Sequence, residues 1–328
     1  MTENYEILSR DPDSSVNCFF GGFSRVAAHN GINASESDIF CFGEGYFLES
    51  IIDEYGLPEL SYPFHKTIAQ FCRNTDITLK TFHLQSEISS QVIDMLRKEG
   101  PVVCLTNTAG LPYLQDKYSK VGYTHAITIL DADERGVHVL DRFVSGTPPS
   151  SCEVLISWDS LGDAIRGVYE FPQYTKLGVF FTIENGSTFK FDESARRKQL
   201  KLISEKILAS DNVRASAHSH FSYCTQLIAQ DPGRATEVLD LLAYDITTDH
   251  VIPSRALLKK TIDAVSPNNA EFNVAFSDTD RAWRDLANLA RICAKKSTFD
   301  KEKIFLKFER AIDSEIRLWG TVNLIEER

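Results

Sequence analysis

SSVNCFFGGFSRVAAHN, residues 14–30, is the stretch of the chain that decides the fold. Its aromatic and aliphatic residues recur at helical spacing, and it ends in an Asn that is followed by Gly, as is typical of a helix end. We therefore predict a helix over residues 18–29, with Ser14 or Ser15 as its N-cap. Cys18 then stands in the first turn, where the helix dipole favours a thiolate. A small buried side chain that merely begins a helix would suit the same position, so Cys18 is a candidate nucleophile that needs a base.

A histidine and an aspartate stand on two adjacent β-type segments. Residues 124–130 (THAITIL) and 136–142 (GVHVLDR) are rich in β-branched residues, and a short linker separates them. If all residues between the two segments form the loop of a hairpin, His125 lies directly opposite Asp141, with Cβ atoms about 4.5–5.5 Å apart. Asp141 can then orient the imidazole of His125 as a base for Cys18. A loop one residue shorter or longer puts the two side chains on opposite faces, and a chance His and Asp at a sheet edge is the other interpretation.

The 328-residue chain carries a formal net charge of −11 and seven cysteines. Residues 1–186 carry −12 and the remainder +1, so the acidic first part argues against a nucleic-acid partner and suits a cationic small molecule. An acidic charge is also common among cytosolic proteins. The odd number of cysteines without a CxxC pair argues against a disulfide framework and against a metal site. No leader and no bilayer-length apolar run is evident, and we expect a soluble cytoplasmic protein that contacts no membrane.

The chain changes character near residue 190. Before it, short helical and β-type segments alternate, with helices at 64–72 and 88–98 and a hairpin at Asn185-Gly186 between strands at 177–183 and 188–191. After it, amphipathic helical patterns predominate. The helices predicted there span 194–208, 235–243, 254–264, 278–294 and 301–319. We therefore predict an α+β catalytic domain over residues 1–190, followed by an all-α domain over residues 191–328.

Short motifs occur in a fixed order around the candidate nucleophile. After the helix that begins with Cys18, they are Ser35-Glu36, Phe40, the glycine turn Gly43-Glu44-Gly45, Leu111-Pro112-Tyr113, and the strands of His125 and Asp141. In this order and at these spacings the chain resembles the butirosin-biosynthesis H-type acyltransferase family. The resemblance covers most of residues 15–170 and, more weakly, the helical remainder.

The resemblance implies a papain-like catalytic domain with a helical C-terminal domain. It also implies transfer of an acyl, aminoacyl or peptidyl group from the thioester of an acyl or peptidyl carrier protein, through acyl-Cys18, to an amine acceptor in natural-product biosynthesis. Phosphopantetheine arrives on the carrier protein, so the chain itself needs no cofactor. In such a reaction His125 would deprotonate the amine, and the Cys18 N–H is a candidate oxyanion donor beside the side chain of Asn17 or Ser14.

Other residues are candidates for binding the substrate. Gly43 and Gly45 would let the backbone approach the acyl chain and Glu44 would bind a cationic acceptor, although the three residues also suit an ordinary turn. Asn107 stands where members of the family tend to have an Asp, which leaves the identity of the acceptor open. Tyr113 is either a wall of the acceptor pocket or a core aromatic.

Two other functions are compatible with the residues. One is a cysteine peptidase or a thioester hydrolase or cyclase of the same fold, in which water or an internal amine resolves acyl-Cys18. The other is a binding module without catalysis, against which the complete Cys-His-Asp set argues. The cations that could hold an acidic carrier protein, or equally form ordinary solvated faces, are Arg196, Arg197, Lys198, Lys201, Lys259, Lys260, Lys295 and Lys296.

Overall fold

The protein is described by a computed structural model that covers residues 5–11, 15–52, 56–62, 64–84, 87–114, 122–144, 150–168, 178–184, 188–209 and 212–325. The chain forms two compact units, each assembled from two segments. The first unit contains Met1–Glu36 and Thr75–Phe189, and the second unit contains Ser37–Asn74 and Lys190–Arg328. The predicted domain boundary lies beside the border at Phe189, whereas Ser37–Asn74, which the sequence placed in the first domain, packs with the C-terminal helices.

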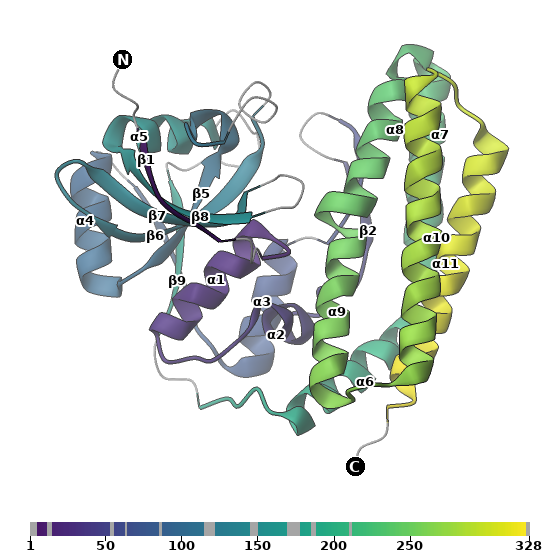
Figure 1. Ribbon diagram of the computed structural model, residues 1–328, viewed down its shortest axis with the longest axis horizontal. Helices are drawn as coiled ribbons and strands as arrows, with labels where there is room; N and C mark the ends of the chain where they lie inside the picture. Colours follow the sequence, from purple (N-terminus) through teal and green to yellow (C-terminus); the bar gives the residue numbers. More distant parts are fainter. Residues whose placement is uncertain are drawn as a thin grey trace. The chain divides into compact units, whose positions relative to one another are not determined.

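The first unit is built on a seven-stranded sheet with the strand order β1-β8-β7-β6-β5-β9-β4, in which all neighbours are antiparallel (Figure 1). The strands are β1 (Tyr5–Asp11), β4 (Leu79–His83), β5 (Val102–Asn107), β6 (Thr124–Ala132), β7 (Gly136–Val144), β8 (Ser150–Ser157) and β9 (Val179–Ile183). The helices are α1 (Cys18–His29), α4 (Ile88–Glu99) and α5 (Trp158–Gly167), with a 3-10 turn η1 (Thr108–Gly110).

Helix α1 lies along the sheet and contacts β5, β6, β7 and β9 (Figure 1). The close approach depends on Gly22, where an added Cβ would lie 2.7 Å from Oγ1 of Thr128 and 3.4 Å from a methyl group of Val103. Residues on either side of Val103 point to the other face, where α4 and α5 contribute Val92 and Ile165 to a buried cluster. The sheet is therefore covered on both faces, and its strand ends carry the polar residues described below.

The second unit consists mainly of helices. Its elements are α2 (Glu36–Phe42), β2 (Glu49–Ile52), β3 (Pro58–Ser61), α3 (Phe64–Thr75), α6 (Glu193–Ala209), α7 (Asn212–Gln230), η3 (Pro232–Arg234), α8 (Ala235–Tyr244), the π-helix η4 (Asp245–Asp249), α9 (Val251–Val265), α10 (Ala270–Lys295) and α11 (Lys301–Asn323). Among the described residues, no helix is both long enough and apolar enough to cross a bilayer.

Polar bonds explain why Ser37–Asn74 packs with these helices. The backbone N–H of Leu60 on β3 donates to the buried carboxylate of Asp245 at 3.0 Å, and the hydroxyl of Tyr46 lies 3.2 Å from that of Thr261. The carboxylate of Asp38, itself 1% exposed, is paired with Arg196 at 2.7 Å. A buried carboxylate without its cation would be costly, so this pair couples α2 to α6.

The predicted class, an α+β region followed by an all-α region, is confirmed. The strand predicted at 188–191 is wrong, because these residues form no strand and β9 pairs with β4 and β5 instead. The Asn185-Gly186 turn predicted beside it lies outside the described residues. Six elements have no counterpart among the predicted ones: β1, β2, β3, β8, α5 and α7. Two of these, β1 and β8, pair with each other, and such long-range pairing leaves only a weak local pattern.

Candidate active site

Cys18 is the first residue of α1, as the sequence predicts. The N-cap is Asn17, whose Oδ1 accepts hydrogen bonds from the backbone N–H of Phe19 at 2.9 Å and of Phe20 at 3.2 Å. The prediction of Ser15 as the cap is therefore wrong. Its backbone N–H instead donates to the carbonyl of Arg142 on β7 at 2.8 Å. Ser14 lies outside the described residues. Because Asn17 satisfies the next two N–H groups, the Cys18 N–H is left at the helix start as a candidate oxyanion donor.

Glu36 holds the segment that precedes the nucleophile. Its carboxylate accepts from the backbone N–H of Asn17 at 2.8 Å and from that of Val16 at 3.1 Å through each of its oxygens. A carboxylate that accepts backbone N–H groups forms stronger hydrogen bonds than a neutral acceptor does. In the sequence, Ser35-Glu36 was one of the ordered motifs and had no predicted contact. The structure shows that Glu36 fixes the backbone one residue before Cys18.

Replacing Glu36 by alanine is expected to destabilise the fold and to slow the alkylation of Cys18. The change leaves two partly buried N–H groups without their acceptor, which costs roughly 1–3 kcal/mol, and it frees the segment that positions the thiol. Urea unfolding and the rate of iodoacetamide labelling at Cys18 measure the two effects. Glu36→Gln should restore part of both because its amide oxygen still accepts, and the exposed Glu134→Ala should change neither. Unchanged labelling in Glu36→Ala would assign Glu36 to stability alone.

His125 and Asp141 are bonded to each other. Nε2 of His125 lies 2.8 Å from Oδ2 of Asp141, and both side chains are buried, at 8% and 0% exposure. With Nε2 engaged, Nδ1 is the ring nitrogen that remains for a second partner. Cys18 lies near enough to the same imidazole for its charge to raise the pKa of His125. The structure therefore brings the three predicted residues together, from α1, β6 and β7.

The register that produces this contact differs from the predicted one. The hairpin loop consists of residues 133–135, and Ala132 faces Val137 where Leu130 was predicted to face Gly136. A β-bulge at Leu130 then shifts the pairing, so that Thr128 faces Leu140. The prediction that His125 lies directly opposite Asp141 is therefore wrong.

The bulge decides which side chains share a face. Continuing the register of Thr128 and Leu140 places Asp141 opposite Ile127, two residues from His125 and on the same face. Without the bulge, Asp141 would be opposite Thr128, whose side chain points to the other face. One inserted residue thus preserves the contact that a shortened loop would have removed.

Electrostatics at the site favour a protonated imidazole. Burial alone lowers the pKa of His125, but the carboxylate of Asp141, the charge of Cys18 and the hydrogen bonds to both raise this pKa well above its ordinary value of 6.5. On the neighbouring strand, burial and then Asp141 raise the pKa of the Cys152 thiol to about 12, so Cys152 stays a neutral thiol. The arrangement supports an imidazolium at His125 beside the carboxylate of Asp141.

Tyr113 and Asn107 were predicted to bind substrate, and the structure places both in buried positions. The hydroxyl of Tyr113 donates to Oδ2 of Asp141 at 3.0 Å, a contact that sequence reasoning missed. The amide of Asn107 is engaged on both sides: its oxygen accepts from the N–H of Ala109 at 2.8 Å, and its nitrogen donates to the carbonyl of Gly167 at 3.0 Å. Asn107 thus caps η1 and ties it to the end of α5.

The predicted glycine turn belongs to the second unit. Gly43 is packed so closely that an added Cβ would lie 2.5 Å from the carbonyl oxygen of Thr67, and Gly45 likewise contacts the ring of Phe40. Glu44 adopts a positive φ of 55° and pairs with Lys206 at 2.6 Å. These contacts support the structural interpretation of the turn, and the substrate-binding role of its residues stays a prediction.

The clustered cations of α6 are only partly available to a partner. Arg196 is paired with Asp38, and the guanidinium of Arg197 binds Glu193 and the carbonyl of Val265. Lys198 and Lys201 are exposed on the same helix. A carrier protein that binds this segment would therefore meet these two lysines and not the arginines.

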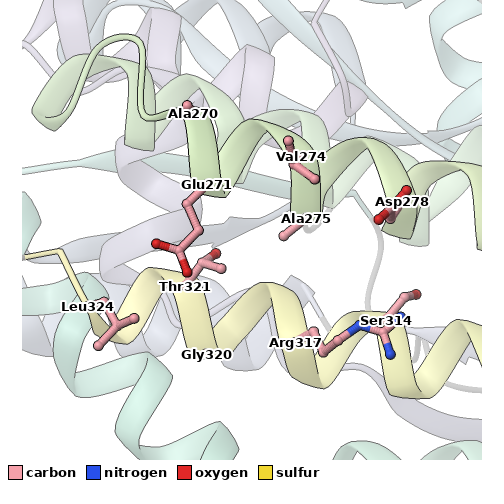
Figure 2. Close-up of a pocket in the computed structure, with 10 residues that line it drawn as sticks. All are labelled: Ala270, Glu271, Val274, Ala275, Asp278, Ser314, Arg317, Gly320, Thr321 and Leu324. Carbon is pink, nitrogen blue, oxygen red and sulfur yellow. The ribbon is translucent and has the colours of Figure 1, made fainter.

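The helical unit contains an open groove between α10 and α11, of about 810 Å³ (Figure 2). Its lining residues are Ala270, Glu271, Val274, Ala275, Asp278, Ser314, Arg317, Gly320, Thr321 and Leu324. None of the residues predicted to be catalytic or substrate-binding is among them. Within the described part of the chain, no group of three or more His, Cys, Asp or Glu side chains is arranged to hold a metal ion.

Comparison with known proteins identifies the part of the chain that carries this site. A search of curated proteins found no match to the chain. Residues 17–142 match the profile of a protein family described as butirosin biosynthesis protein H, N-terminal. The match begins one residue before Cys18, includes Glu36, Tyr113 and His125, and ends one residue after Asp141. Residues 17–142 are therefore similar to the N-terminal region of butirosin biosynthesis protein H, which confirms the resemblance inferred from the sequence.

Proposed function

We propose that the protein is a cysteine-dependent acyltransferase of antibiotic or related secondary metabolism. It moves an acyl, aminoacyl or peptidyl group from a carrier-protein thioester, through acyl-Cys18, to an amine acceptor. The observation that carries the proposal is the buried bond between His125 and Asp141, together with Cys18 near enough to the same imidazole to raise its pKa. The family match over residues 17–142 supports the setting, a biosynthetic pathway.

The first half-reaction is an exchange between thioesters. The Cys18 thiol gives its proton to His125, and the thiolate attacks the carbonyl carbon of the donor thioester. The carbonyl oxygen becomes negative and is stabilised by the Cys18 N–H at the start of α1, a contact helped by the helix dipole. When the tetrahedral intermediate collapses, the donor sulfur leaves as a thiolate and takes up a proton from the imidazolium of His125. The acyl group is now joined to Sγ of Cys18 as a thioester.

The second half-reaction transfers the group to the acceptor. The lone pair of the amine attacks the acyl-Cys18 carbonyl, and His125 accepts the proton that the amine loses as the amide forms. The thiolate of Cys18 is the leaving group, so the free enzyme is regenerated with its proton on His125. Asp141 keeps the imidazole in one orientation throughout and stabilises its charged form. No metal and no resident cofactor enters these steps, since phosphopantetheine belongs to the donor.

The test is a measurement of intact protein mass after incubation with thioesters. Carrier proteins loaded with different acyl, aminoacyl and peptidyl groups, and their short N-acetylcysteamine thioesters, serve as donors. We expect a stoichiometric mass increase equal to the acyl group, which peptide mapping assigns to Cys18 and not to Cys72, the other partly exposed cysteine described. Addition of amines should then remove the adduct and release an amide.

Other outcomes would point to the alternative functions. Rapid loss of the adduct to water, with no amide formed at any amine concentration, would indicate a thioester hydrolase. If an amine within the acyl group itself releases the adduct, the protein is a cyclase. Cleavage of peptides would indicate a peptidase. No adduct with any donor, together with ordinary iodoacetamide reactivity of Cys18, would leave a binding module that lacks catalysis.

A further inference from the structure

We propose that Tyr113 is a positioning residue of this site: its hydroxyl orients the carboxylate of Asp141 toward His125 and withdraws negative charge from it. The inference rests on the proposed function, in which Asp141 serves His125. It replaces the substrate-binding role that the sequence predicted for Tyr113. The contact that carries it is the hydrogen bond of 3.0 Å from the tyrosine hydroxyl to Oδ2 of Asp141.

Both oxygens of the buried carboxylate are engaged. Oδ2 accepts from the hydroxyl of Tyr113 and faces Nε2 of His125 at 2.8 Å, while Oδ1 accepts from the backbone N–H of Phe143 at 3.0 Å. Two partners approach Oδ2 from different directions, and a third approaches Oδ1. Together they fix the rotation about the Cβ–Cγ bond and therefore the plane of the carboxylate. Without the hydroxyl, the imidazole of His125 would be the only partner of Oδ2. The carboxylate of Asp141 would then take its orientation from His125, which it is meant to orient.

The tyrosine is held independently of the carboxylate. Its side chain is 4% exposed and packs in the core cluster that also contains Leu111, Leu114 and Ile127. The turn that carries Tyr113 is closed by hydrogen bonds from the N–H of Leu111 to the carbonyl of Thr108 and from the N–H of Leu114 to the carbonyl of Leu111, each 3.1 Å long. A rigid donor of this kind can impose a position on Asp141.

The ionisable groups around the hydroxyl keep it a donor. Burial raises the pKa of Tyr113 well above 10, and the nearby Asp141, Cys152 and Cys18 raise it further. The charge of Arg10 on β1 acts to lower the pKa of Cys152. His125 faces Oδ2 of Asp141, the same oxygen that the hydroxyl contacts. The hydroxyl therefore stays protonated over the working pH range and draws electron density from Oδ2. A less basic Oδ2 leaves the shared proton on Nε2 and stabilises the imidazolium less, so His125 can more readily release its other proton, on Nδ1.

The experiment compares Tyr113→Phe with Tyr223→Phe, a matched loss of an exposed hydroxyl on α7. Titration of ¹³C-labelled histidines by NMR, with the His125 signal assigned from its absence in His125→Ala, reads the imidazole directly and needs no substrate. We expect Tyr113→Phe to raise the pKa of His125 by about half a unit to one unit, because the carboxylate recovers its full charge. With a reactive thioester, kcat should fall roughly tenfold at unchanged KM, the effect of one lost hydrogen bond to a charged group.

A second variant guards against a simple packing effect. Incorporation of 3-fluorotyrosine at position 113 preserves the ring and makes the hydroxyl a stronger donor, so the pKa of His125 should fall. Opposite shifts in the two variants would support the proposal. An unchanged His125 titration in both, or a higher KM with unchanged kcat in Tyr113→Phe, would overturn it and return Tyr113 to the substrate pocket or the core. Because the titration involves no acyl donor, its result is independent of whether acyl transfer itself is observed.

Discussion

Replacing Cys18 by alanine abolishes the acyl adduct and reduces turnover by roughly 10⁴-fold or more, which is the expected result if the thiolate is the nucleophile. No other described cysteine can substitute for it: Cys152 is the one beside Asp141, and burial keeps it a neutral thiol. The fold should remain intact, because Cys18 is only partly buried and its helix is capped by Asn17 and not by the thiol. Intact mass, single-turnover kinetics and urea unfolding measure the three expectations.

The matched control is Cys72→Ala, which removes the other partly exposed cysteine and should leave adduct formation unchanged. His125→Ala should be nearly as damaging as Cys18→Ala, and the double variant no worse than either, since residues that act as a unit are not additive. An adduct that still forms in Cys18→Ala, at more than a trace, would contradict the mechanism. Loss of the adduct in Cys72→Ala would move the nucleophile to the second unit.

The second large effect is expected at Asp141. An Asp141→Asn variant should lose roughly 10³–10⁴-fold in kcat, although its side chain has nearly the same shape. The amide offers a single acceptor where three donors converge: the hydroxyl of Tyr113, the N–H of Phe143 and Nε2 of His125. If the NH₂ group faces Nε2, the imidazole must carry its proton on Nδ1, toward the thiol, and can no longer accept one there.

The measurement is kcat with a reactive thioester, with the histidine tautomer read from ¹⁵N NMR shifts. Asp131→Asn, an exposed carboxylate near the end of the same hairpin, is the control and should be within a factor of two of the native protein. Some loss of stability is also expected, roughly 1–3 kcal/mol for a buried donor left without an acceptor. Native activity in Asp141→Asn would show that His125 needs no carboxylate, and would remove Asp141 from the proposed function.

The sequence by itself determined the local elements and the order of the reactive residues. Helix α1 begins and ends at the predicted residues, because a 3.6-residue apolar period and an Asn-Gly end are local signals. The strands of His125 and Asp141, and most of the C-terminal helices, follow from the same kind of pattern. The resemblance to a family, carried by motifs in order, then selected Cys18 from among seven cysteines.

Only the tertiary structure decided how those residues meet. The bulge at Leu130 changes which residues of β6 and β7 face each other, and a single extra residue leaves almost no trace in an alternating pattern. The contacts of Glu36 with the N–H of Asn17 and of Tyr113 with Asp141 join residues far apart in the chain. The packing of Ser37–Asn74 with the C-terminal helices likewise rests on partners such as Asp245 and Arg196. The periodicity of a sequence shows which face of a helix or strand is buried. Which partner packs against that face or bonds to it depends on the whole chain, so these contacts could not be predicted from the sequence.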